Sequence, residues 1–115
     1  MLEDCKMSTP WGTAQQKQVH ARGLFTIHTA GHGGLVVSRG LAQKVLSQEA
    51  INCAAIVTSS YVFFEEDCAV SVAIVDSPYI RKELAATYGR TAQELHDQAM
   101  QSVRRWFPKY FEVTL

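Results

Sequence analysis

Two short clusters of polar residues in this chain combine side chains that often carry chemistry in proteins. The first is the segment His28-Thr29-Ala30-Gly31-His32-Gly33-Gly34, and the second is Phe63-Phe64-Glu65-Glu66-Asp67-Cys68. An imidazole that pairs with a carboxylate can act as a general base, and glycine amides can surround an anion or an oxyanion. The two clusters are therefore the first candidates for a functional site.

One hypothesis for the clusters is a small, hydrolase-like enzyme. An imidazole would act as base or ligand, and a carboxylate would orient it or act as an acid. The candidate catalytic residues are His32, Glu65, Glu66 and Asp67. The amides of Gly33 and Gly34 would form the cradle for an oxyanion or a phosphate.

A purely structural explanation competes with the enzyme hypothesis. The glycines would form a tight turn, the three carboxylates would cap a following helix, and Cys68 would be an ordinary core residue. The sequence contains neither a Gly-x-Ser-x-Gly nucleophile elbow nor a GxxxxGK[ST] phosphate loop. Both explanations stay open at this point.

Metal binding is a third alternative for the first cluster. His28 and His32 lie four residues apart, a spacing that suits metal ligation on a helix. The surrounding glycines argue against a helix, so ligation would come from a strand and its following loop, with an acidic third ligand. We assign no metal and no cofactor to the chain.

A third cluster near the end of the sequence points to binding. The segment Arg104-Arg105-Trp106-Phe107-Pro108-Lys109-Tyr110-Phe111 holds four aromatic rings and three cations. Such residues often bind protein partners. The alternative is structural: the rings would anchor the core, and the cations would stabilise the C-terminus of a helix. The candidate binding residues, with the glycines of the first cluster included, are Arg104, Arg105, Trp106, Lys109, Tyr110, Gly33 and Gly34.

The composition limits the classes of function. The chain has 115 residues with 11 basic and 11 acidic side chains, which give a formal net charge of zero. This balance argues against a nucleic-acid partner and favours self-association, for example as a homodimer. Three cysteines without CxxC spacing indicate reduced thiols, and the apolar stretches are too short to cross a membrane. We therefore expect a cytoplasmic protein.

The pattern of apolar and turn-forming residues predicts an α+β fold. We expect a small antiparallel sheet of three to four strands, with about four helices packed on it. Residues 1–12 would be a partly flexible segment that Trp11 pins to a single domain over 13–115. The expected strands are 15–21, 24–30, 34–38 and 54–64, and residues 110–114 would form an edge strand or a tail.

Capping residues place the helices. Ser38 would cap a helix over 40–48, Ser77 and Pro78 would begin one that ends at Gly89, and Thr91 with Glu94 would form a capping box. This last helix would stop before Pro108. Residues 69–75 alternate like a strand, but carboxylates precede them, so we predict a helix there.

Four segments together resemble an uncharacterised domain family of phage, plasmid and proteobacterial proteins. They are Thr9-Pro10-Trp11-Gly12-Thr13-Ala14-Gln15, Thr29-Ala30-Gly31-His32-Gly33-Gly34, Phe64-Glu65-Glu66-Asp67-Cys68 and Arg105-Trp106-Phe107-Pro108. They are similar to the family signatures TPWGxAQ, TAxHGG, [YF]EEDC and R-x-W-x-P. The chain departs from the pattern over about residues 40–60, and Ala69 and Val70 stand where a tryptophan is expected.

The resemblance implies a mobile-element setting and supplies no mechanism. Small proteins in that setting often bind a host or defence component. Our leading hypothesis is a protein-binding, anti-defence inhibitor, such as an anti-CRISPR protein, whose partner is a host defence complex. The alternative is the small enzyme built on His32 and the carboxylates at 65–67.

Overall fold

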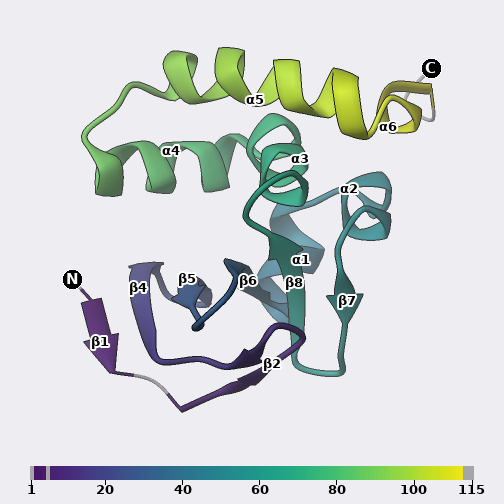
Figure 1. The fold of residues 1–115 in the computed structure, drawn as a ribbon. Helices are drawn as coiled ribbons and strands as arrows, with labels where there is room; N and C mark the ends of the chain where they lie inside the picture. The colour runs from purple at the N-terminus through teal and green to yellow at the C-terminus, as the bar shows by residue number, and fades with distance from the viewer. Residues whose placement is uncertain (1, 5, 113–115) are drawn as a thin grey trace.

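A six-stranded antiparallel sheet forms the centre of the fold (Figure 1). The computed structural model describes residues 2–4 and 6–112. In spatial order the strands are β1 (Leu2–Asp4), β4 (Gln16–Ala21), β5 (Leu24–His28), β6 (Gly33–Ser38), β8 (Tyr61–Glu65) and β7 (Ile56–Val57). A separate two-stranded sheet joins β2 (Ser8–Thr9) to β3 (Gly12–Thr13). The predicted α+β class is confirmed.

The sheet has more strands than the three to four that we expected, for two reasons. Part of the segment 1–12 pairs with the sheet, since β1 lies antiparallel beside β4. The predicted strand 54–64 is in fact the hairpin of β7 and β8, because Thr58 turns the chain: its amide donates to the Tyr61 carbonyl at 2.8 Å, and its hydroxyl oxygen accepts from the Tyr61 amide at 3.0 Å.

Six helices occur among the described residues, where about four were expected. They are α1 (Arg39–Val45), α2 (Gln48–Asn52), α3 (Ala69–Asp76), α4 (Pro78–Tyr88), α5 (Ala92–Trp106) and α6 (Lys109–Glu112). The predicted helix 40–48 stops at Val45, because Ser47 begins a second helix by accepting the amide of Ala50. The edge strand or tail predicted at 110–114 is helical through Glu112, and its last residues lie outside the described part.

The predicted helix signals are confirmed. The Ser38 side chain accepts from the Leu41 amide, and Ser77 accepts from the Ile80 amide ahead of Pro78. Gly89 ends α4 in the left-handed conformation at φ 64°, and Thr91 with Glu94 forms a complete capping box. Residues 69–75 are helical as predicted, within α3.

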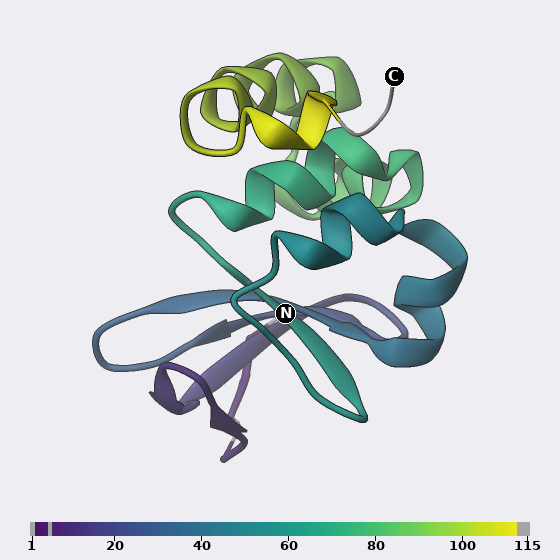
Figure 2. The same cartoon turned by 90° about the vertical axis from the view of Figure 1, so that its right-hand side faces the viewer.

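The two faces of the sheet have different covers. The helices α3, α4 and α5 lie over one face, and the segment with β2 and β3 lies below the other (Figures 1 and 2). The larger apolar cluster joins alternate strand residues to the helices, and the smaller one contains Ala14, Ile27, Val36 and Phe63. Trp11 packs against this smaller cluster, with its ring 6.0 Å from that of Phe63, which confirms its predicted role. In the described part, no helix is long and apolar enough to span a membrane.

Candidate functional site

A tight turn between β5 and β6 holds His32. The Thr29 amide donates to the His32 carbonyl at 2.8 Å, and the His32 amide donates to the Thr29 hydroxyl at 3.0 Å. The Thr29 hydroxyl also donates to the His32 carbonyl. These bonds close the turn on itself and leave the His32 side chain exposed at the start of β6. The backbone of His32 is therefore fixed while its ring can reach a ligand.

The acidic cluster lies at the end of the neighbouring strand. Glu65 is the last residue of β8 and pairs with Gly34 of β6, and the Glu66 amide donates to the Gly33 carbonyl at 3.2 Å. Asp67 follows in the turn before α3. The helix α3 begins at Ala69, its N-cap residue Cys68 makes no capping hydrogen bond through its side chain, and the first turn contains no acidic residue. The prediction that the carboxylates cap this helix is wrong.

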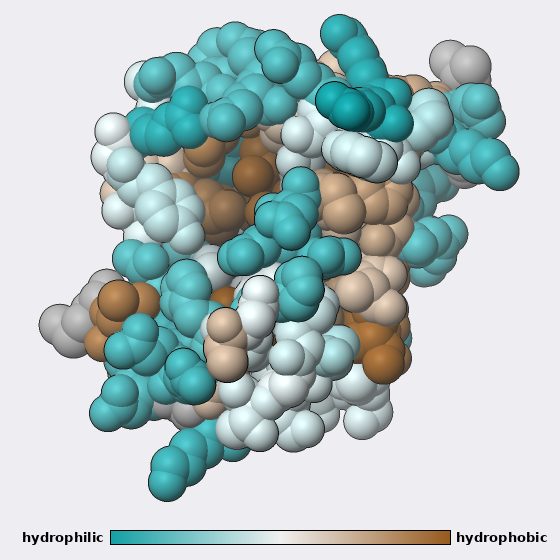
Figure 3. Space-filling view, in the orientation of Figure 1, coloured by the Kyte–Doolittle hydropathy of each residue, from teal (hydrophilic) through white to brown (hydrophobic). Residues whose placement is uncertain are grey.

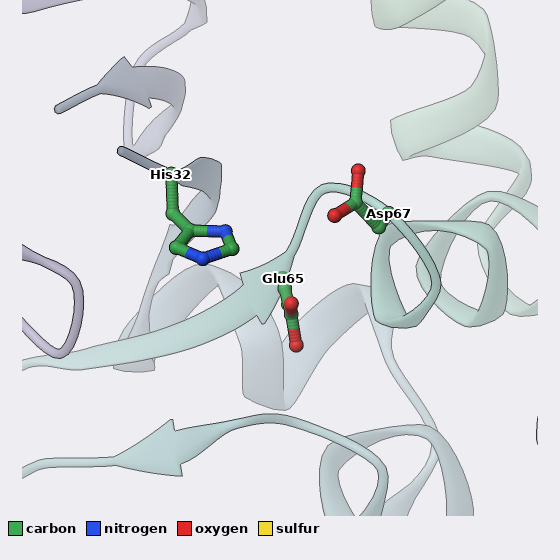
Figure 4. Close-up of side chains that lie close together, drawn as sticks. All are labelled: His32, Glu65 and Asp67. Carbon is green, nitrogen blue, oxygen red and sulfur yellow. The ribbon is translucent and has the colours of Figure 1, made fainter. Parts of the chain in front are cut away.

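The structure brings His32, Glu65 and Asp67 together (Figure 4). One ligand atom from each, an imidazole nitrogen or a carboxylate oxygen, lies within 4.8 Å of the others. His32 and Asp67 are exposed, and Glu65 is half-buried. In the described part of the chain, no hydrogen bond or ion pair joins these three side chains to one another or to a further group.

Two other candidates lie apart from this group, in an apolar cleft between the sheet and the helices. Glu66 and His28 both line the cleft, whose volume is about 240 Å³. Its walls come from β5, β6, α3, α4 and α5 and are mainly apolar, and Figure 3 shows the hydrophobic hollow below the upper helices. His28 is not part of the group around His32, so the proposed His28–His32 ligand pair is not brought together as one site.

Gly33 and Gly34 lie in strand β6, not in the tight turn that we considered for the glycines, and both have a packing role. Both are buried within β6 and pair with His28 and Ile27 of β5. A Cβ at Gly33 would collide with the backbone carbonyl of Ile27, and one at Gly34 would meet the Phe64 carbonyl and the Trp11 ring. The neighbouring backbone and the Trp11 indole therefore leave no room for a side chain at either position, which explains why both residues are glycine.

The thiol of Cys68 shows no sign of activation. Partial burial and the neighbouring Glu65 carboxylate both raise its pKa. A thiol with a raised pKa carries little thiolate at neutral pH, and the thiolate is the nucleophile. This favours the interpretation of Cys68 as a structural residue.

The C-terminal cluster is divided between surface and core. Arg104, Arg105 and Lys109 are exposed, and the Trp106 side chain is 59% exposed with the Arg105 guanidinium 5.0 Å from its ring centre. Tyr110, by contrast, is only 8% exposed and donates to Asp76 at 2.7 Å. Tyr110 therefore lies in the core, and the surface consists of the three cations and the indole.

Comparison with known proteins identifies a family for this chain but no activity. The model of a domain of unknown function, DUF7007, matches residues 4–115. The chain belongs to the DUF7007 family. No curated protein and no solved structure matches it. The resemblance to an uncharacterised family is thereby supported, while a phage or plasmid origin for the DUF7007 chain stays a prediction.

Two polar residues of the DUF7007 domain were missed by sequence reasoning. His20 of β4 bonds to the hydroxyls of Thr87 and Thr26 at 2.8 and 2.7 Å, and burial lowers its pKa to about 4. Asp76 ends α3 and accepts from both Ser47 and Tyr110. Neither residue stands in a motif, and their partners are distant in sequence, so no local signal marked them.

Proposed function

We propose that this DUF7007 domain binds a protein partner through the surface formed by Arg104, Arg105, Trp106 and Lys109, here called the α5 end surface. The single observation that carries the proposal is the exposure of Trp106, which is the most exposed large hydrophobic residue in the described part of the chain. Tryptophan and arginine are the residues most enriched at the energetic centres of protein interfaces.

The charge of this surface indicates the kind of partner. Three cations lie within three residues of Trp106 in the sequence, the guanidinium of Arg105 lies 5.0 Å from the centre of its ring, and segment 104–111 contains no acidic residue. An acidic protein surface would complement it, and such complementarity gives specificity and a faster association rate. The zero net charge of the chain keeps nucleic acid the weaker alternative.

The resemblance to mobile-element proteins suggests which acidic partner to test first. We propose a host defence complex, such as a CRISPR effector, with the DUF7007 domain as its inhibitor. The α5 end surface is also available to a second copy of the chain, so self-association competes with this partner. Light scattering of the purified protein, with and without Trp106→Ala, separates the two.

Binding is tested with the purified partner after affinity capture has identified it. Trp106→Ala and the pair Arg104→Glu/Arg105→Glu should each weaken binding about 30-fold or more, the size typical of an interface hot spot. The matched control is Lys44→Glu/Lys82→Glu, which makes the same charge change at exposed lysines of α1 and α4. Wild-type affinity in the first two variants, with folding intact by circular dichroism, would discard the surface.

A second candidate function is a small hydrolase-like enzyme. The convergence of His32 with Glu65 and Asp67 favours it, because a carboxylate beside an imidazole can orient the ring and raise its basicity. His32→Gln should abolish hydrolysis of activated esters or phosphoesters, whereas His28→Gln should not. An absence of turnover with all such substrates would count against the enzyme and leave the partner proposal untouched.

A further inference from the structure

We propose that His32, Glu65 and Asp67 bind one divalent transition-metal cation, for which Zn²⁺ is the first ion to test. The site goes beyond the partner-binding function, because none of its three residues belongs to the α5 end surface. It rests on the geometry of the group, its charge and the hydrogen bonds that support its backbone.

The donor set suits a borderline metal ion. One imidazole nitrogen and two carboxylates are ligands that Zn²⁺ accepts, whereas Mg²⁺ and Ca²⁺ prefer oxygen alone. The three ligand atoms lie within 4.8 Å of one another. Ligands of a tetrahedral ion stand about 3.3 Å apart for bonds of the usual length. Rotation of the exposed His32 and Asp67 side chains can close this gap.

The charge of the group favours a cation. Two carboxylates lie within 4.8 Å of each other beside a single imidazole. The described residues contain one ion pair, between His96 and Asp97, so neither Glu65 nor Asp67 is neutralised by a lysine or arginine. The two carboxylates are not in the first turn of α3 and do not cap the helix. A bound divalent ion would remove the repulsion between them.

The backbone fixes the positions of the three residues relative to one another before any ion binds. The bonds between Thr29 and His32 fix the turn, and the β6–β8 pairing sets Glu65 opposite Gly34. The bond from the Glu66 amide to the Gly33 carbonyl ties the acidic turn to β6. Because the ligands come from two neighbouring strand ends, the ion would bridge the turn before β6 and the turn after β8.

The site would leave part of the ion open. Three protein ligands leave at least one position for water or an anionic ligand. Asp67 also lines a cleft of about 250 Å³ between α3 and α5, so the ion would lie next to a cavity. If His32 binds the ion through the nitrogen that faces the carboxylates, that nitrogen cannot serve as a base. Metal binding and the base role of His32 are therefore alternatives.

Isothermal titration of ZnCl₂ into the tag-free, chelator-treated protein tests the proposal. We expect one ion per chain, with His32→Ala and Asp67→Asn each weakening the affinity at least tenfold. The controls are His28→Ala and Glu66→Gln, which remove an imidazole and a carboxylate just outside the group and should stay within about threefold of wild type. Circular dichroism and thermal unfolding establish that each variant folds.

Three outcomes would overturn the site. They are no binding of Zn²⁺ or Mn²⁺, unchanged affinity in the two ligand variants, and an equal loss in the two controls. A thermal shift with Zn²⁺ that disappears in Glu65→Gln, which alters the half-buried third ligand, would support it independently. Arg104→Glu/Arg105→Glu should leave the metal affinity unchanged, so failure of the metal site and failure of the partner surface are distinguishable.

Discussion

The hydroxyl of Tyr110 donates a 2.7 Å hydrogen bond to the Oδ1 atom of Asp76, which joins α6 to the end of α3. The same carboxylate accepts the Ser47 amide at 2.8 Å and the Ser47 hydroxyl at 2.6 Å. One half-buried carboxylate thus connects α2, α3 and α6. Because α6 follows α5 directly, this bond also fixes the corner at which Trp106 is exposed.

The Tyr110–Asp76 bond should contribute measurably to stability. Burial and the Asp76 carboxylate raise the pKa of Tyr110, so its hydroxyl remains a donor at neutral pH. We expect Tyr110→Phe to lower the free energy of unfolding by about 1.5 kcal/mol, the size of a bond to a charged group. Urea denaturation measures the change, and Tyr79→Phe, on an exposed ring, is the control. Equal stabilities of the two variants would contradict the assigned role.

His20 should make stability depend on pH. Its pKa is about 4 in the folded protein and 6.5 when unperturbed, because burial disfavours the charged ring. Between these values the unfolded chain binds the proton that the folded protein rejects, so stability is full above about pH 6.5 and falls as the pH drops toward 4. Urea midpoints at pH 7 and pH 5 should differ more for wild type than for His20→Gln. The same pH dependence in both would show that His20 does not carry it.

Gly34 should tolerate no side chain. An alanine Cβ would collide with the Phe64 carbonyl and lie 2.5 Å from the Trp11 ring, so we expect Gly34→Ala to destabilise the fold by about 2 kcal/mol or more. Gly40→Ala is the matched control, since a Cβ there meets nothing within 4 Å and alanine favours helix α1 by up to about 1 kcal/mol. Thermal unfolding should move the two variants in opposite directions.

The capping box at the start of α5 should make its own contribution to the stability of the protein. Thr91→Ala removes the side chain that accepts the Glu94 amide, and we expect a loss of about 1 kcal/mol in the free energy of unfolding. Gln101→Ala changes an exposed position in the same helix and should have little effect. If the two substitutions cost the same, the cap is not what stabilises the start of α5.

Local chemistry accounts for the features that sequence reasoning predicted correctly. Ser38, Ser77 and Thr91 each accept an amide three residues further along the chain, and Gly89 only needs a left-handed backbone angle, so their roles are encoded within one turn. The division of 54–64 into a hairpin was missed because its turn uses Thr58 and two serines, with neither glycine nor proline.

The sequence by itself determined the α+β class, the boundaries of α3, α4 and α5, and the residue types of the candidate site, because these depend on periodicity and caps. Only the tertiary structure decided how those types are grouped. The pairing of β6 with β8 places His32 beside Glu65 and Asp67, while the alternation of side chains across the sheet and the turn sends Glu66 to the cleft with His28. The tertiary structure also decided that Tyr110 is buried and Trp106 is exposed. The Asp76 carboxylate, distant in sequence, accepts the Tyr110 hydroxyl, and Trp106 lies at the corner between α5 and α6.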